Sequence, residues 1–247
     1  MDRDLIEIKK HWDNTSTVSL KDTNLQKIER YYILKTFEKI GQVVLLADIG
    51  CGDASDTIYW CDYANEVYGY DYSLSMLELA KRNYNDKIKL YQLDLLNDNI
   101  NINFDVIVTK RCLINLGNFE NQKKSIFKIH KWIKKNGFYI MLECCMDGLD
   151  NLNSFRKNFE LEPIKEPFHN KYFNLKILMD YINEYFYVID VKNFSTYYFL
   201  TRVYNQIISK ERYTEFDAIS KMVHERIDMF GSTIIGPQFL MVLKKRE

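Results

Sequence analysis

Short apolar runs alternate with amphipathic stretches through the first half of the chain. The apolar runs, each of which predicts a strand, occupy residues 43–47, 66–70, 87–93, 104–108 and 138–142. Uninterrupted apolar strands are typical of a parallel sheet that helices cover on both faces. Strands that alternate with helices require right-handed crossovers. The pattern therefore predicts a doubly wound α/β sheet.

Helical spacing of apolar residues predicts the elements between and around these strands. Ser73 is a suitable N-cap for a helix that reaches Asn83, and Asn136-Gly137 is a C-terminal signal for a helix over 120–135. Two further strands bring the predicted sheet to seven, at 186–191 and 238–243. The remaining predicted helices cover residues 4–10, 23–40, 56–63, 174–185 and two stretches that end at Phe230.

The chain divides into four parts of a single predicted domain. Residues 1–40 form N-terminal helices, in which aromatic residues such as Trp12 belong either to the core or to a lid. Residues 41–145 form a ligand-binding core, and residues 174–247 form the second half of the sheet. Residues 146–173 contain two of the three prolines and predict an insertion over the edge of the sheet.

Composition narrows the function classes. The 247 residues include 34 basic and 34 acidic side chains, and this neutrality argues against a nucleic-acid partner. The five cysteines form no C-x-x-C pair, so neither a disulfide framework nor a metal site is expected. The charged N-terminus is unlike a signal peptide, and no apolar run is long enough to span a bilayer. We therefore expect a cytoplasmic protein with no membrane partner.

Chemistry-bearing residues follow the first three strands. In open α/β sheets, ligands bind at the carboxyl ends of the strands. Gly50 and Gly52 allow a tight turn close to a ligand. Asp71, about 20 residues further on, suits a ribose diol. Asp94 can accept a hydrogen bond from the amine of an adenine, so the series predicts an adenosine-containing ligand.

The sequence of the glycine loop distinguishes between two adenosine-containing ligands. A dinucleotide site favours G-x-G-x-x-G, with a pyrophosphate at the helix N-terminus. Here Asp53 follows the second glycine and would repel the pyrophosphate. Asp48 and Asp53 instead suit a ligand that carries an ammonium and a sulfonium. The loop therefore favours S-adenosyl-L-methionine over a nicotinamide dinucleotide.

These motifs resemble the class I S-adenosylmethionine-dependent methyltransferases. The likeness extends over about residues 22–145 and rests on the segments 48–52, 69–73, 93–95 and 104–108. It implies an antiparallel last strand, and Ala54 departs from it where a third glycine is usual. By resemblance, the glycines flank the methionine moiety, Asp71 holds the ribose, and Lys110 lies near the sulfonium. The cofactor residues so implied are Asp48, Gly50, Cys51, Gly52, Asp71, Tyr72, Met76, Asp94, Leu95 and Lys110.

The acceptor side offers three candidate catalytic residues, Arg111, Asn115 and His169, and Glu143 as a further residue of its wall. Arg111 can grip an anionic acceptor through its forked donors, or it forms an ordinary surface salt bridge. Asn115 follows on the same loop, and Glu143 ends the fifth strand. His169 is the best candidate for a base because its ordinary pKa lies near neutrality, although loop histidines are often bystanders.

Several acceptors remain open. The segment 22–25 and Glu29 resemble an N-terminal segment of methyltransferases from surface-polysaccharide and small-molecule pathways, and the segments 111–115, 169–173 and 236–238 add to this resemblance. The resemblance implies O-methylation of a phosphorylated or sugar-linked metabolite in bacterial capsule biosynthesis. An N-methyltransferase for an amine or a nucleotide sugar and a non-catalytic relative are the alternatives. Monomer and homodimer are both compatible with the sequence.

Overall fold

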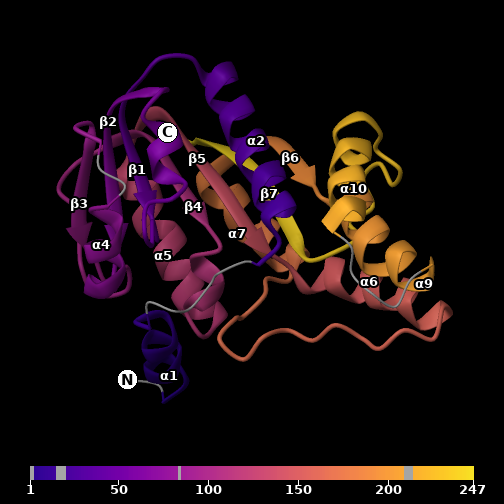
Figure 1. The fold of residues 1–247 in the computed structure, drawn as a ribbon. Coiled ribbons are helices and arrows are strands. Elements are labelled where there is room, and N and C mark those ends of the chain that lie inside the picture. Colours follow the sequence, from indigo (N-terminus) through magenta and orange to yellow (C-terminus); the bar gives the residue numbers. More distant parts are fainter. Residues whose placement is uncertain (1–2, 15–20, 83–84, 209–213) are drawn as a thin grey trace.

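The computed structural model describes residues 3–14, 21–82, 85–208 and 214–247. Its centre is a seven-stranded sheet in the order β3-β2-β1-β4-β5-β7-β6 (Figure 1). β7 runs antiparallel to both of its neighbours, and the other pairs are parallel. The predicted doubly wound, mostly parallel sheet is confirmed. The strands are β1 (Val43–Ile49), β2 (Ala64–Asp71), β3 (Ile88–Gln92), β4 (Phe104–Lys110), β5 (Ile133–Cys144), β6 (Phe186–Asn193) and β7 (Gln238–Lys245).

Helices cover both faces of the sheet because successive strand residues point to opposite sides. In β1, Leu46 packs into the core beneath α2 (Thr23–Ile40), α3 (Thr57–Trp60) and α6 (Met146–Asn158). Ala47 packs into the opposite core, beneath α5 (Phe119–Trp132) and α7 (Leu175–Tyr185). The other helices are α1 (Arg3–Trp12), α4 (Leu74–Ala80), η1 (Leu113–Asn115), α8 (Ser195–Phe199), the π-helical η2 (Leu200–Tyr204), α9 (Asn205–Ile208) and α10 (Thr214–Arg226). None of the helices in the described ranges is long and apolar enough to cross a membrane.

Several predicted helix ends differ from the observed ones: α4 ends at Ala80, and Asn83, its predicted end, lies outside the described residues. The largest consequence is at the end of α5. The helix predicted over 120–135 ends at Trp132, and Ile133 already pairs with Phe104 of β4. Asn136 adopts a positive φ of 65° beside Gly137, where the β4–β5 register shifts. The Asn-Gly signal therefore marks a distortion inside the fifth strand, and pairing with β4 shortens the helix.

Residues 146–173, predicted as an insertion over the edge of the sheet, consist of a helix and an extended connection. The helix is α6, whose Leu149 and Leu152 are buried, and Leu152 packs into the core beneath α2. The second half is an extended connection that returns to the carboxyl ends of the strands, where the Lys171 N–H donates to the Ile114 carbonyl at 2.6 Å. This connection and α1 lie at the same end of the molecule (Figure 1).

Candidate functional site

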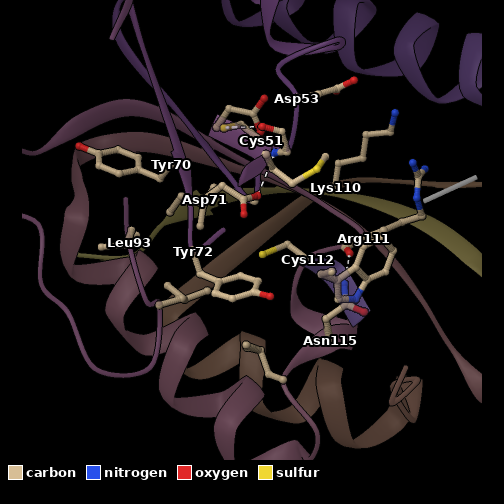
Figure 2. A pocket seen from close by; sticks show the side chains of 18 of the residues that line it. Cys51, Asp53, Tyr70, Asp71, Tyr72, Leu93, Lys110, Arg111, Cys112 and Asn115 are labelled. Carbon is tan, nitrogen blue, oxygen red and sulfur yellow. Dashed lines mark hydrogen bonds between the residues drawn. The ribbon is translucent and has the colours of Figure 1, made fainter. Parts of the chain in front are cut away.

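A cavity of about 490 Å³ opens at the carboxyl ends of β1, β2 and β4, beside the point where strand order reverses. Asp71 and Tyr72 lie on one side of it, and the residues that follow β4 lie on the other (Figure 2). All ten residues expected to bind the cofactor line it, as do Arg111 and Asn115. The walls also include Leu5, Ile8, Lys9 and Trp12 of α1, and Gln26, Asp53 and Asp56.

The glycine loop after β1 lies in close contact with Cys112, which follows β4. Gly50 has a φ of 80°, and a Cβ built there would lie 2.7 Å from the Sγ of Cys112. The Gly50 and Cys51 N–H groups both donate to the Tyr70 carbonyl, at 2.7 and 3.0 Å. Ala54, which stands where a third glycine is usual, also has a positive φ of 58°. The loop keeps the left-handed turn without the third glycine.

Asp71 joins this loop to the start of α4. Its Oδ2 accepts from the Gly52 N–H at 2.9 Å, and its Oδ1 accepts from the Ser73 N–H at 2.9 Å. Burial raises the pKa of Asp71, and the backbone donors oppose that rise. The carboxylate is therefore fixed at the cavity wall, where a vicinal diol could reach it; its contact with a ribose stays a prediction.

Asp48 fixes the start of the glycine loop through hydrogen bonds to α3. It is only 4% exposed, and its Oδ2 accepts from Thr57 Oγ1 at 2.7 Å and from Trp60 Nε1 at 2.9 Å. Burial raises the pKa of Asp48 to about 6. The Asp48 side chain thus connects the end of β1 to α3.

Asp94 already has a basic partner. Its Oδ2 accepts from the Lys9 ammonium of α1 at 2.5 Å and from Asn97 Nδ2 at 2.9 Å, and its Oδ1 accepts from the Leu96 N–H at 3.1 Å. Partial burial would raise the pKa of Asp94, but these donors, with Lys9 first, hold it below its ordinary value.

A cluster of buried and partly buried charges stands behind the wall after β4, and Asp56, Lys110 and Arg111 of this cluster line the cavity. Glu29 of α2 has no exposed surface and pairs with both Lys110 and Arg111. Asp56 pairs with Lys110 and with Arg30. The cluster, defined by these five residues, contains three cations and two carboxylates. Gln238 of β7 adds a neutral donor to Glu29 at 2.5 Å.

Arg111 is therefore not engaged in a surface salt bridge. Its side chain is 12% exposed, and its backbone has a positive φ of 53°. Such a conformation is costly for a residue with a Cβ and tends to occur where function constrains the chain. Lys110 is 7% exposed and faces the same cavity.

Glu143 fixes the loop that carries this wall. Its Oε1 accepts from the Cys112 and Leu113 N–H groups at 3.2 and 3.0 Å, and its Oε2 accepts from the Ile114 N–H at 3.3 Å. Complete burial raises the pKa of Glu143 to about 7, although the three backbone donors favour the carboxylate.

This raised pKa predicts a pH dependence of stability. Between about pH 4.5 and 7 the native state binds the Glu143 proton more tightly than the unfolded chain, so this residue's contribution to stability falls as pH rises. The slope cannot exceed about 1.4 kcal/mol per pH unit, the limit for one proton. Urea unfolding of the wild type and Glu143→Gln across this range measures the difference, because a glutamine side chain cannot titrate. Parallel curves would contradict the assignment.

His169 does not line the cavity. Its ring stacks on His11 of α1 with centroids 4.3 Å apart and meets Trp12 and Phe168 edge-on. Burial, and then the neighbouring His11, lower the pKa of His169. His169, the expected base, therefore lies where the connection after α6 packs against α1.

Sequence reasoning assigned no site role to Glu29 or Lys9. Glu29 meets Arg111 across 82 positions of the chain, and Lys9 meets Asp94 across 85. No local spacing signals partners this distant. For Trp12 the sequence allowed either core or lid, and the structure places it on the cavity wall.

Solved structures share the fold at low sequence identity. The N-methyltransferase NodS of Bradyrhizobium japonicum WM9, in complex with S-adenosyl-L-homocysteine, is 12% identical over 100% of both chains, with a TM-score of 0.62. The magnesium protoporphyrin IX methyltransferase of Synechocystis PCC 6803, with bound S-adenosylhomocysteine, is 12% identical over 98% of this chain and 94% of that one, with a TM-score of 0.58.

A chain from the complex of the Haloferax volcanii Trm112 methyltransferase activator with a methyltransferase is 11% identical over 100% of this chain and 99% of that one, with a TM-score of 0.61. No curated protein matches the chain. The family model of the methyltransferase domain matches residues 41–216, well over half of the sequence. The prediction of a methyltransferase is thereby confirmed, and the chain belongs to the methyltransferase domain family.

Proposed function

We propose that this methyltransferase transfers a methyl group from S-adenosyl-L-methionine to an anionic oxygen of a small phosphorylated or sugar-linked metabolite. The observation that supports it best is the placement of the two walls. The glycine loop and Asp71, which follow β1 and β2, form one wall of the cavity, and the members of the cation-rich cluster that follow β4 form the adjoining wall.

The methyl donor is S-adenosyl-L-methionine, and the cavity suits it. The loop approaches so closely at Gly50 that a Cβ would overlap Cys112. Five carboxylates line the walls against three basic side chains, which favours a ligand bearing an ammonium and a sulfonium. We assign the methionine moiety to the glycine loop, the ribose to Asp71 and the adenine to Asp94 and Leu95. The carboxylates are Asp48, Asp53, Asp56, Asp71 and Asp94, and the bases are Lys9, Lys110 and Arg111.

The charge cluster favours an anionic acceptor. Three cations, Lys110, Arg111 and Arg30, meet two carboxylates in it, those of Glu29 and Asp56. The five residues together therefore carry a net positive charge, in surroundings where charges interact more strongly than in water. A phosphate or carboxylate of the acceptor would balance it.

The walls also favour an acceptor that needs no deprotonation. None of the four histidines, all of which lie in the described ranges, lines the cavity. Burial alone would raise the pKa of Asp56, but Lys110 and Arg30 hold it below its ordinary value, which makes Asp56 a poor base. A hydroxyl or ammonium acceptor would have to lose a proton first, whereas a phosphate or carboxylate oxygen is already ionised near pH 7.

Catalysis then depends chiefly on position. When bound, the donor would supply a methyl group from its sulfonium to the acceptor oxygen and would leave as S-adenosyl-L-homocysteine. Lys110 and Arg111 orient the oxygen, and Asn115 lies beside them on the loop that Glu143 fixes. Leu5, Ile8 and Trp12 of α1 cover the cavity and limit water. Holding two reactants in line accounts for most of what such a reaction requires.

A transfer screen tests the acceptor class. The full-length protein is incubated with methyl-labelled donor and matched sets of phosphorylated sugars, sugar carboxylates, nucleotide sugars and amines. We expect label in the phosphate or carboxylate sets, and the resemblance to polysaccharide-pathway enzymes makes capsule precursors the first choice. Label confined to amines would replace O-methylation with N-methylation. Donor binding without label in any set would support a non-catalytic relative.

Cofactor binding has its own prediction. S-adenosyl-L-homocysteine should raise the melting temperature through linkage. Asp71→Ala should weaken its binding by about 1–3 kcal/mol, or roughly 5- to 150-fold in Kd, because hydrogen bonds to a charged acceptor are lost. Titration calorimetry measures this, with Asp62→Ala as the control at an exposed carboxylate outside the cavity. Wild-type affinity in Asp71→Ala would remove Asp71 from the site.

A further inference from the structure

Helix α1 is held over the cavity by polar contacts at its C-terminal end. The Tyr72 hydroxyl donates to the Lys9 carbonyl. Just beyond the helix, Asp13 accepts from Ser73 Oγ at 2.8 Å through its carboxylate and from Ser75 Oγ at 2.8 Å through its carbonyl. These contacts bind α1 to the segment that follows β2, and they bring its apolar residues onto the cavity wall.

The Lys9 side chain goes further and reaches Asp94. Its Nζ lies 2.5 Å from Asp94 Oδ2, and the two side chains are 24% and 25% exposed. Lys9 Nζ also lies 5.6 Å from the centre of the Tyr72 ring, a second interaction that favours the cation at this place. The ammonium therefore occupies one oxygen of the carboxylate to which the proposed function assigns the adenine amine.

The other contacts of the Asp94 carboxylate leave little room for an adenine amine beside the Lys9 ammonium. Asp94 Oδ1 accepts from the Leu96 N–H at 3.1 Å, and Asn97 Nδ2 shares Oδ2 with Lys9 at 2.9 Å. An adenine amine that approaches Asp94 would meet three donors already in place. Lys9 and Asn97 occupy both lone pairs of Oδ2, so an adenine amine that binds this oxygen competes with the ammonium.

We propose that Lys9 is an internal competitor of the cofactor: its ion pair with Asp94 helps to hold α1 as a lid over the cavity, and the adenosyl group displaces the Lys9 ammonium while the contacts of Tyr72 and Asp13 keep α1 in place. This inference rests on the proposed function. Leu5, Ile8 and Trp12, on the same helix, form the underside of the lid.

The test is a binding measurement with S-adenosyl-L-homocysteine on the full-length protein. Removing a partly exposed ion pair changes an equilibrium by about two- to fivefold. Lys9→Met should therefore bind the probe about two- to fivefold more tightly than the wild type, and Lys9→Arg should not. Lys10→Met is the matched control, since Lys10 is exposed on the same helix and does not line the cavity. Rising salt should reduce the difference between Lys9→Met and the wild type.

A second readout follows the lid itself. Hydrogen exchange of the α1 amides should be faster in Lys9→Met than in Lys10→Met, because the ion pair no longer holds the helix. Equal or weaker binding in Lys9→Met would overturn the competitor role, and unchanged exchange would overturn the lid. If no variant and no wild-type sample binds the probe, the proposed function itself fails, so the two failures are distinguishable.

Discussion

Replacing Glu29 with glutamine is expected to lower the free energy of unfolding by about 3–5 kcal/mol, the range for breaking a buried ion pair from one side. Glu29 is fully buried and accepts from Lys110, Arg111 and Gln238. Without its charge, Arg111 loses the carboxylate that it contacts in the cluster, and Lys110 keeps that of Asp56. The loss of a fully buried carboxylate that two cations contact is the main cost.

Denaturant unfolding measures this loss. Glu38→Gln in the same helix is the control, because Glu38 forms an exposed i,i+3 pair with Lys35 and should matter little. Adding Arg111→Met to Glu29→Gln should restore part of the stability, since it removes a cation that Glu29 balances. A loss below about 1 kcal/mol in Glu29→Gln would mean that the two cations find other partners and would contradict the cluster as described.

The sheet was predictable because its signal is local. Each of the five apolar runs lies within the observed strand or overlaps it closely, and the helix predicted over 23–40 has those bounds. That helix begins at an N-cap, Asp22, whose carboxylate accepts from the Leu25 N–H at 3.0 Å, and it stops where Gly41 has a φ of 86°. Caps act within four residues, so the sequence contains them in full.

The end of α5 was not predictable in this way. Asn136-Gly137 is a good stop signal, but Ile133 leaves the helix earlier to pair with Phe104 of the preceding strand. A strand partner at that distance overrides a local propensity. The same limit applies to Lys9 and Glu29, whose functional contacts exist only once the sheet has formed.

The site itself was predictable in part for a topological reason. Residues at the carboxyl ends of parallel strands share one edge, so Asp48, Asp71 and Asp94 had to come together if the strands were correctly identified. All three line one cavity. Their hydrogen-bond partners were not predictable, and these partners show Asp48 tied to α3 and Asp94 tied to α1.

Gly50→Ala should be the most damaging change to the glycine loop. Alanine at a φ of 80° costs about 1–2 kcal/mol, and a Cβ there would lie 2.7 Å from Cys112 Sγ and 2.8 Å from Cys112 Cβ. Overlap of that kind adds about 1–3 kcal/mol, and rotation of the thiol cannot relieve the contact with Cβ. We expect a total loss of about 2–5 kcal/mol in stability, with a sharp fall in affinity for S-adenosyl-L-homocysteine.

Gly52→Ala separates strain from overlap. Gly52 has a φ of 55°, but a Cβ there would meet only Met76 at 3.5 Å, an ordinary contact. Thermal unfolding should therefore show a smaller loss for Gly52→Ala. Cys112→Gly added to Gly50→Ala should recover the overlap component, because the nearest remaining atom of residue 112 is its Cα at 3.8 Å. If the double variant is no more stable than Gly50→Ala, Gly50 does not contact Cys112. The close approach of the glycine loop to the residues after β4 would then no longer support the cofactor assignment.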